Sequence, residues 1–599
     1  MTDLERTGQV SAFSRWYVNV AACLAACVSP LPMHVGARAQ SYDPATQGPA
    51  TLLKAPTDAL AYHAARQRVR VLLDEKRAVE AETLAGQLVR EYPRDGQNWL
   101  LLGAAKREMG NFTEAATAHE RAAELLGWNI DQVPWVRAAM DHLAAGNRRA
   151  ALDLLHRGIF EQRSVNRSWL FEQAEFAPLR SDPEFLEIVG RVDGAGWPRD
   201  LGWRHDIDFL RDEVKRVNPD YHDRPLPPEF ERRHADLKQK VPQLSDEEIL
   251  VGLNRMLASM RQGHTSLNGL GGSRIQERKL PFHTWLFPEG LFIVNATDEH
   301  RDLIGARLVS IEGVLAQEAL RRVNETQSVD GDNEYLVSGT GLLSLAPYLK
   351  GLGITRSAEE IRVTLQRPGK SIETVTLATV QTYFVWGLAP PPEVQPPLFL
   401  RNMTQAHWHQ ALPEHDALYV QLNQVSDDKD ETLSAYGQRL RGTLALSAPS
   451  NLILDLRHNP GGTTKKYPEL LRTLIGFSQM PGRRIYVLIG RNTYSAAGNL
   501  ITDLERLADP LFVGEASSEC CWLYGDPSSF RLPFSKISGS VAGLRWNLSH
   551  TPLDGRREMS PQVPVLLTAR DYFAGHDPVM QTVLRMISQD TRLPATASD

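Results

Sequence analysis

Cysteine is scarce in this chain, with four residues in 599. Cys23 and Cys27 lie close to the N-terminus, and the other two, Cys520 and Cys521, are neighbours. A disulfide between neighbours is strained and would add little as a staple. The sequence therefore excludes a disulfide framework, and it has no cysteine spacing typical of a zinc site.

Blocks of lysine and arginine are also missing. The formal net charge is −6, which is small for this length and argues against nucleic acid as a partner. With 42% hydrophobic and 23% charged residues, the chain has the composition of a globular protein with substantial cores. Its length is several times that of a usual domain of roughly 100–200 residues, so we expect three or four domains.

No apolar run is long enough to span a bilayer comfortably. The best candidate follows Arg15, is interrupted by prolines and ends in Ala37-Arg38-Ala39, which resembles a signal-peptidase site. We therefore predict a signal peptide at 1–39 and a periplasmic or secreted protein. The stretch "LAAC" also resembles a lipoprotein cleavage box, and the alternative is a membrane-anchored lipoprotein with a lipid on Cys27.

Residues 62 to 165 contain a repeat. Three residues recur 36 positions later: Trp99, Gly110 and Ala115 as Trp135, Gly146 and Ala151. The pattern resembles tetratricopeptide repeats, whose period is about 34 residues. We predict a domain of such helical repeats at 40–195. Stacked helix pairs leave a concave face for a protein partner, although a helical cap without a partner fits equally well.

The rest of the chain predicts a multidomain fold in four further segments. Apolar residues at helical spacing indicate a helical subdomain at 196–275. Short alternating runs such as "GLFIVNA" and "EIRVTLQ" indicate a β-rich module at 276–385. A proline-rich linker is expected at 386–415. Strands and helices then alternate over 416–599, which is typical of an α/β layered core.

Two turns in this last segment could carry chemistry. In "NLILDLRHNPGG" a buried strand runs into Gly461 and Gly462, and backbone N–H groups at glycines can form an oxyanion hole. An isolated Gly-Gly is more often a tight turn. In "IYVLIGRNTYSAAGNL" Ser495 falls at the start of a helix, where serine usually caps but could also be a nucleophile near the amide of Ala496.

Several blocks together resemble a known family, the tail-specific or C-terminal-processing serine peptidases. They are similar to the branch with the tricorn core and the retinoid-binding modules. The blocks occur in the family's order and cover about residues 200 to 590: "GHTSL", "GARLVSIEG", "ALYVQLN", "LILDLRHNPGG", "NTYSAAGN" and "LFVGE". The resemblance implies a PDZ-like module within 276–385 and a core similar to Clp protease and crotonase.

The resemblance also implies roles for individual residues. Ser495 falls on the family's nucleophile and His264, in "GHT", on the general base of the tricorn-like branch. The amides of Ala496 and of Gly461 or Gly462 fall on the oxyanion hole. The chemistry is consistent, because a serine hydroxyl needs a neighbouring base and neutral histidine suits pH 7. No metal or organic cofactor is implied.

Two departures from the family affect the site. The Ser–Lys dyad of the processing proteases is absent, because "VGEASSECCWLYGD" contains no lysine. We therefore favour a Ser–His pair. The imidazolium needs an orienting carboxylate, for which Glu558 is the first choice and Asp554 the second. These residues predict a serine endopeptidase that cleaves protein or peptide substrates through an acyl-enzyme on Ser495.

Three alternatives stay open at this point. The same fold could serve as an inactive binding protein for peptides or hydrophobic ligands, and the repeats could make the chain a scaffold. The distance between His264 and Ser495 separates the enzyme from the binding protein. A cluster of His407, His409 and His415 could hold a metal, although surface histidines are the more common explanation.

Overall fold

The computed structural model describes residues 59–127, 134–162, 167–381, 387–392 and 394–590. The predicted signal peptide and Cys27 lie outside these residues. The chain divides into two compact units, residues 1–105 and 106–599. In its described part, the first unit contains α2 (Ala59–Asp74), α3 (Ala78–Glu91) and most of α4 (Gly96–Glu108). No helix in the described ranges has the length and apolar character needed to cross a membrane.

The second unit begins with a series of helices in which the same kind of turn recurs. These are α5 (Phe112–Leu126), α6 (Pro134–Ala144), α7 (Arg148–His156), α8 (Arg167–Glu172) and α9 (Pro183–Ile188). Gly110 before α5 and Gly146 before α7 both have positive φ, 78° and 82°, a backbone conformation that glycine adopts without strain. The repeated glycines therefore close equivalent turns. The helical N-terminal region is confirmed, while its assignment to tetratricopeptide repeats stays a prediction.

Three helices follow and pack around one core: α10 (Arg199–Val217), α11 (Pro228–Lys240) and α12 (Asp246–Ala258). A capping box fixes the start of α12, since Ser245 accepts a hydrogen bond from the Glu248 backbone and the Glu248 side chain bonds back. After α12 the chain turns through His264 into β1 (Ser266–Gly269). These helices therefore lead into the turn that carries His264, the predicted base.

The β-rich module has an antiparallel sheet in the order β2-β3-β4-β6-β7, with β5 paired to β4. Its strands are β2 (Phe282–Phe287), β3 (Gly290–Ala296), β4 (Arg307–Ile311), β5 (Val314–Leu315), β6 (Glu360–Gln366) and β7 (Ile372–Ala378). Helices α13 (Ala316–Asn324), α14 (Glu334–Leu342) and α15 (Ala346–Gly351) lie between β5 and β6. The alternating runs of the sequence coincide with β3, β4, β6 and β7.

The C-terminal part is a layered α/β core around a six-stranded sheet in the order β15-β12-β11-β10-β9-β8. The strands are β8 (His407–Leu412), β9 (Ala417–Leu422), β10 (Asn451–Asp455), β11 (Arg484–Ile489), β12 (Leu511–Gly514) and β15 (Val563–Pro564). Pairs from β9 to β15 are parallel, and β8 is antiparallel to β9. β9 and β10 are buried along their whole length, as expected for parallel strands covered on both faces.

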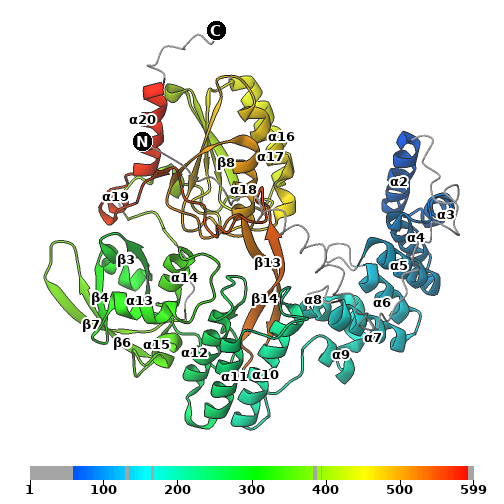
Figure 1. Cartoon of the computed structure of the whole chain (residues 1–599), viewed down its shortest axis with the longest axis horizontal. Helices are drawn as coiled ribbons and strands as arrows, with labels where there is room; N and C mark the ends of the chain where they lie inside the picture. Colours follow the sequence, from blue (N-terminus) through cyan, green and yellow to red (C-terminus); the bar gives the residue numbers. More distant parts are fainter. Residues whose placement is uncertain (1–58, 128–133, 163–166, 382–386, 393, 591–599) are drawn as a thin grey trace, which may run out of the picture. The chain divides into compact units, whose positions relative to one another are not determined.

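Helices cover both faces of this sheet (Figure 1). Helices α16 (Leu433–Ser447), α17 (Pro468–Ser478) and α18 (Ala496–Ala508) share one apolar core with it, and α20 (Pro578–Asp590) shares another. The sheet begins at β8, so the core starts inside the segment predicted as the linker 386–415. The reason is that "HWHQAL" pairs as an edge strand with β9.

A long hairpin links this core to the helical subdomain. Its strands are β13 (Trp522–Arg531) and β14 (Ser538–Asn547), and β14 also pairs with β1. At the tip, the backbone N–H groups of Phe534 and Ser535 donate to the buried Asp206 of α10 at 2.8 and 2.7 Å. The hairpin runs between the two regions in Figure 1. It therefore carries β1, and with it His264, to the edge of the core.

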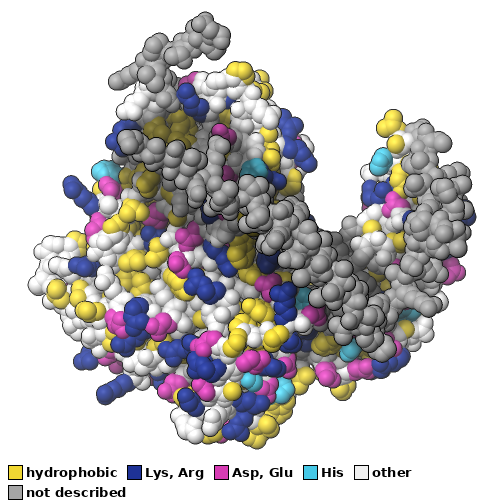
Figure 2. All heavy atoms as spheres, viewed as in Figure 1, with side chains coloured by type: hydrophobic (Ala, Val, Ile, Leu, Met, Phe, Trp, Pro, Cys, Tyr) yellow, Lys and Arg dark blue, Asp and Glu magenta, His cyan; other side chains and the backbone are white. Residues whose placement is uncertain are grey.

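Charged side chains of both signs are intermixed over the described atoms visible in Figure 2. No basic block stands out on this face, in agreement with the small net charge of the sequence.

Candidate active site

Ser495 lies in the turn from β11 to α18 and adopts a strained backbone conformation, φ 55° and ψ −122°. A non-glycine residue rarely takes a positive φ, and such residues cluster at functional sites. The Ser495 side chain makes no capping hydrogen bond to the helix. Its Oγ instead lies 3.0 Å from Nε2 of His264. Of the two roles considered for Ser495, this geometry favours the nucleophile.

Neighbouring residues hold the turn in place. The Thr493 hydroxyl donates to the Leu456 carbonyl at 2.9 Å and accepts from the Gly490 amide at 3.1 Å. The Tyr494 amide donates to the Asn459 carbonyl at 3.1 Å. These bonds connect the turn to the end of β10, so the Ser495 conformation is imposed by two adjacent strands of the parallel sheet.

The loop that carries His264 is fixed from both sides. The Ser540 hydroxyl of β14 donates to the His264 carbonyl at 3.1 Å, and the Gly263 amide donates to Asp330 Oδ2 at 2.9 Å. Burial lowers the pKa of His264, so the imidazole is neutral near pH 7. A neutral ring with Nε2 directed at a hydroxyl can act as a general base.

The other ring nitrogen, Nδ1, faces two side chains. The Tyr494 hydroxyl lies 3.0 Å from it, with the two rings stacked at 4.8 Å and 12°. Glu519 Oε1 lies 3.4 Å from the same nitrogen. The Glu334 and Glu519 carboxylates both interact with the Tyr494 hydroxyl. A tyrosine and a glutamate therefore share the place where a serine triad has its orienting carboxylate.

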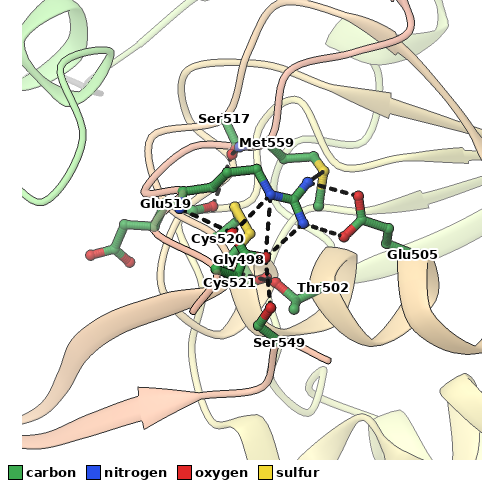
Figure 3. The surroundings of a disulfide bond; sticks show 11 residues. Gly498, Thr502, Glu505, Ser517, Glu519, Cys520, Cys521, Ser549 and Met559 are labelled. Atoms are coloured by element: carbon green, nitrogen blue, oxygen red, sulfur yellow. Dashed lines mark hydrogen bonds and ion pairs between the residues drawn. A yellow bond between two sulfur atoms is a disulfide. The ribbon is translucent and has the colours of Figure 1, made fainter. Parts of the chain in front are cut away.

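Glu519 is held tightly beside the nucleophile. Its Oε2 accepts the backbone N–H of Ser495 at 2.6 Å, and its side chain is fully buried. Figure 3 shows it next to the disulfide between Cys520 and Cys521 and close to Gly498 at the start of α18. Burial raises the pKa of Glu519 to about 7. Glu519 was not among the residues predicted from the sequence.

Two further acids lie behind the histidine. Asp330 precedes α14, and Glu334 is the first residue of that helix. Burial raises the pKa of both groups well above the usual range, and the neighbouring Glu519 carboxylate raises them further. Arg557 pairs with Asp330 at 3.1 Å. These two acids were not predicted from the sequence either, because "SVDGDNEYLVSG" carries no catalytic pattern.

The two carboxylates predicted to orient His264 lie elsewhere, and this part of the prediction needs correction. Glu558 accepts the backbone N–H of Asn333 at 2.6 Å. Asp554 pairs with Arg556 at 2.9 Å and accepts the Ser549 hydroxyl. The physical reason is that the segment before β15 packs against the 517–521 loop, which presents Glu519 to the histidine instead.

The predicted oxyanion donors surround Ser495 closely. A Cβ on Gly461 would lie 2.5 Å from the Ser495 Cβ and 2.9 Å from the Ala496 nitrogen. The Gly461 amide donates to the Asn459 side chain at 2.9 Å, so it is engaged. Ala496 is the first residue of α18, where an amide has no acceptor within its own helix. On either side of Gly462, the Gly461 carbonyl accepts from the Val425 amide and the Thr463 amide donates to the Val425 carbonyl. The N–H of Gly462 itself takes no part in this pairing.

The histidine cluster gives no metal site in the described part of the chain. His407 and His409 lie on β8 and pack against Tyr436 of α16, and His415 follows in the next turn. The one group of three potential ligands found among described residues is His264 with Asp330 and Glu519.

Among known proteins, similarity to this chain is found in solved structures. No family model matches the chain, and no curated protein does. Mature CPAF is 13% identical, with a TM-score of 0.48 over 65% of this chain and 97% of that one. The photosystem II D1 C-terminal processing protease is 13% identical, with a TM-score of 0.29 over 62% and 98%. The tricorn protease is 11% identical, with a TM-score of 0.31 over 65% and 37%.

Proposed function

We propose that the protein is a serine peptidase that works through an acyl-enzyme on Ser495. The observation that carries this proposal is the 3.0 Å contact between Ser495 Oγ and His264 Nε2, made by residues 231 positions apart. A binding protein has no need of this contact, nor of a strained serine at a helix start. The geometry therefore supports the enzyme over the inactive binding protein.

The reaction follows from the positions of the groups. Ser495 Oγ attacks the carbonyl carbon while Nε2 of His264 takes its proton. The negative oxygen of the tetrahedral intermediate is stabilised by the Ala496 amide at the helix N-terminus, with a glycine amide of the 461–462 turn as the second donor. His264 then gives the proton to the leaving amine, and water attacks the acyl-enzyme by the same route.

Glu519 and Tyr494 support the imidazolium that forms in each step. The Nδ1–H of His264 faces the Tyr494 oxygen and Glu519 Oε1, and an ionised Glu519 stabilises the positive ring. Glu519 also binds the Ser495 amide, so one carboxylate positions both the base and the nucleophile.

The substrate class and the roles of the other domains are proposed from the motif resemblance. Protein or peptide substrates are proposed because the motifs that surround Ser495 and His264 resemble a peptidase family. The β-rich module would hold a peptide as an added strand, as PDZ-like modules do. The N-terminal helices would offer a face to a protein partner, and the N-terminal leader would export the chain to the periplasm or outside the cell.

A peptide-hydrolysis assay tests the proposal. An unfolded protein such as casein should be cleaved by the wild type, and Ser495→Ala and His264→Ala should each lose at least about 1,000-fold in kcat. Retained cleavage in Ser495→Ala would end the assignment of the nucleophile. If the chain is a scaffold or a binding protein, none of the three proteins should cleave any substrate.

A further inference from the structure

Three ligand-type side chains converge behind the proposed base. His264, Asp330 and Glu519 each present one ligand atom, and these atoms all lie within 4.8 Å of one another. The two acids are buried, and their side chains have no exposed surface. An imidazole nitrogen with two carboxylate oxygens is a ligand set that Zn²⁺ accepts, with a fourth position left for water.

One oxygen of this group is incompletely satisfied. Glu519 Oε1 is buried and makes no hydrogen bond of good geometry within the described ranges, although Oε2 accepts from the Ser495 amide and the carboxylate as a whole interacts with Asp330 and Tyr494. It faces His264 Nδ1 at 3.4 Å. Leaving a buried carboxylate oxygen unsatisfied costs free energy, so the site gains from any cation that reaches it.

The charge balance points the same way. Asp330, Glu334 and Glu519 place three acidic groups around His264, and Arg557 is the basic side chain that pairs with one of them, at Asp330 Oδ1. Asp330 Oδ2 accepts the Gly263 amide. Each carboxylate oxygen has a second lone pair for another ligand. Three carboxyl groups and one arginine therefore surround the ring, an excess of acidic groups that a cation can offset.

We propose that His264 Nδ1, Asp330 and Glu519 form a binding site for a divalent cation of the Zn²⁺ type, and that the bound cation inhibits the peptidase. The inhibition rests on the proposed function, whereas the binding does not. A cavity of about 580 Å³ lies on the neighbouring residues Gly263, Thr265 and Glu334.

Inhibition follows from the tautomer of the histidine. Catalysis needs Nδ1 protonated and Nε2 free to accept the Ser495 proton. A cation on Nδ1 moves the ring proton to Nε2, and protons held by the carboxyl groups are released to solvent. Nε2 then donates to Ser495 Oγ and can no longer take its proton. The cation also draws Glu519 away from its role beside the ring.

Binding is tested on the Ser495→Ala variant of the full chain, which keeps all three ligands and has no peptidase activity. Titration with Co²⁺, followed by visible absorption, should reveal one tetrahedral site per chain, and calorimetry with Zn²⁺ should give the same stoichiometry. Adding Asp330→Asn should weaken the affinity by about 10- to 100-fold. Adding Asp332→Asn should leave it unchanged, because Asp332 lies in the same loop with 80% of its side chain exposed.

Inhibition is tested separately on the protein with Ser495 intact. Zn²⁺ should abolish hydrolysis, a chelator should restore it, and Asp330→Asn should raise the inhibitory concentration by about tenfold or more relative to Asp332→Asn. Absence of the Co²⁺ spectrum, or full binding in the Asp330→Asn variant, would overturn the site. If Ser495→Ala binds the metal through Asp330 while the wild type cleaves nothing, the site stands and the proposed function falls.

Discussion

At the scale of single residues, the nucleophile and base could be predicted from the sequence, and the acids around them could not. Ser495 and His264 belong to short motifs in a fixed order, and their contact agrees with that pattern. Glu519 was not predicted, because the family pattern leads one to expect a lysine in this stretch and not a carboxylate. The available signal was its place after a parallel strand, where the sites of α/β sheets usually lie. Asp330 reaches the site through tertiary packing, which no local pattern reports.

Removing the Tyr494 hydroxyl should weaken the support of the imidazolium. Tyr494→Phe keeps the ring that stacks on His264 and deletes the oxygen 3.0 Å from Nδ1. A hydrogen bond to a charged group contributes about 1.5–3 kcal/mol, so we expect kcat to fall by about 10- to 100-fold with KM little changed. Tyr335→Phe, on a tyrosine of α14, is the matched control. Equal kinetics for the two variants would contradict the role of Tyr494.

The pH profile should report Glu519 rather than His264. Burial raises the pKa of Glu519 to about 7 and lowers that of His264 below its ordinary value. The base is then already neutral while Glu519 still loses its proton, so kcat should rise with pH through about 7. Glu519→Gln should give a lower kcat without that rise, measured from about pH 5 to 9. A rise that persists in this variant would assign the titration to another group.

At the scale of elements, the alternation of strands and helices predicted the α/β core. The predicted boundary of this core differs from the observed one where pairing between strands determines which segment belongs to the sheet. β8 lies within the segment predicted as a linker, a prediction based on the proline-rich stretch at its start, yet β8 completes the sheet as an edge strand. The hairpin β13–β14 was not predicted, although it determines where His264 lies. Long-range pairing such as β1 with β14 depends on the whole fold.

Alanine substitutions at two glycines, Gly461 and Gly482, test the importance of the turn beside the nucleophile. Gly461 has φ 101°, and a Cβ there would lie 2.5 Å from the Ser495 Cβ and 2.8 Å from the Tyr494 carbonyl. Gly461→Ala should therefore displace Ser495 and reduce kcat by about 100-fold or more. Gly482 has φ 75° and no atom within 4 Å of its Cβ position. Gly482→Ala should cost about 1 kcal/mol of unfolding free energy and leave kcat unchanged, as chemical denaturation and kinetics can show.

At the scale of the whole molecule, the sequence predicted several domains but not the contacts that connect one segment to another. The helices after residue 106 form one compact unit with the rest of the chain to the C-terminus. One reason is a buried ion pair. Arg167 of α8 pairs with Glu213 of α10, which also binds Arg216 at 2.6 Å. A repeat pattern predicts contacts between neighbouring repeats, and it carries no information about a pair 46 positions apart.

Loss of this ion pair should destabilise the second unit without touching the active site. Arg167→Ala removes a partner of the fully buried Glu213, so the unfolding free energy should fall by about 1–3 kcal/mol. Arg148→Ala breaks an ion pair to Asp182 in which the arginine is 50% exposed, and should cost about 0–1 kcal/mol. Denaturation curves check both values. Equal losses of unfolding free energy in the two variants would show that burial of the ion pair does not affect its contribution to stability.

The central claim is that Ser495 is a serine activated by His264. Its most direct test is covalent labelling of the folded protein with a fluorophosphonate, followed by mass spectrometry of the modified peptide. The account predicts one adduct on Ser495 in the wild type, none in Ser495→Ala, and labelling slowed by at least about 100-fold in His264→Ala. An adduct on another serine, or labelling of Ser495 at an unchanged rate without His264, would contradict it.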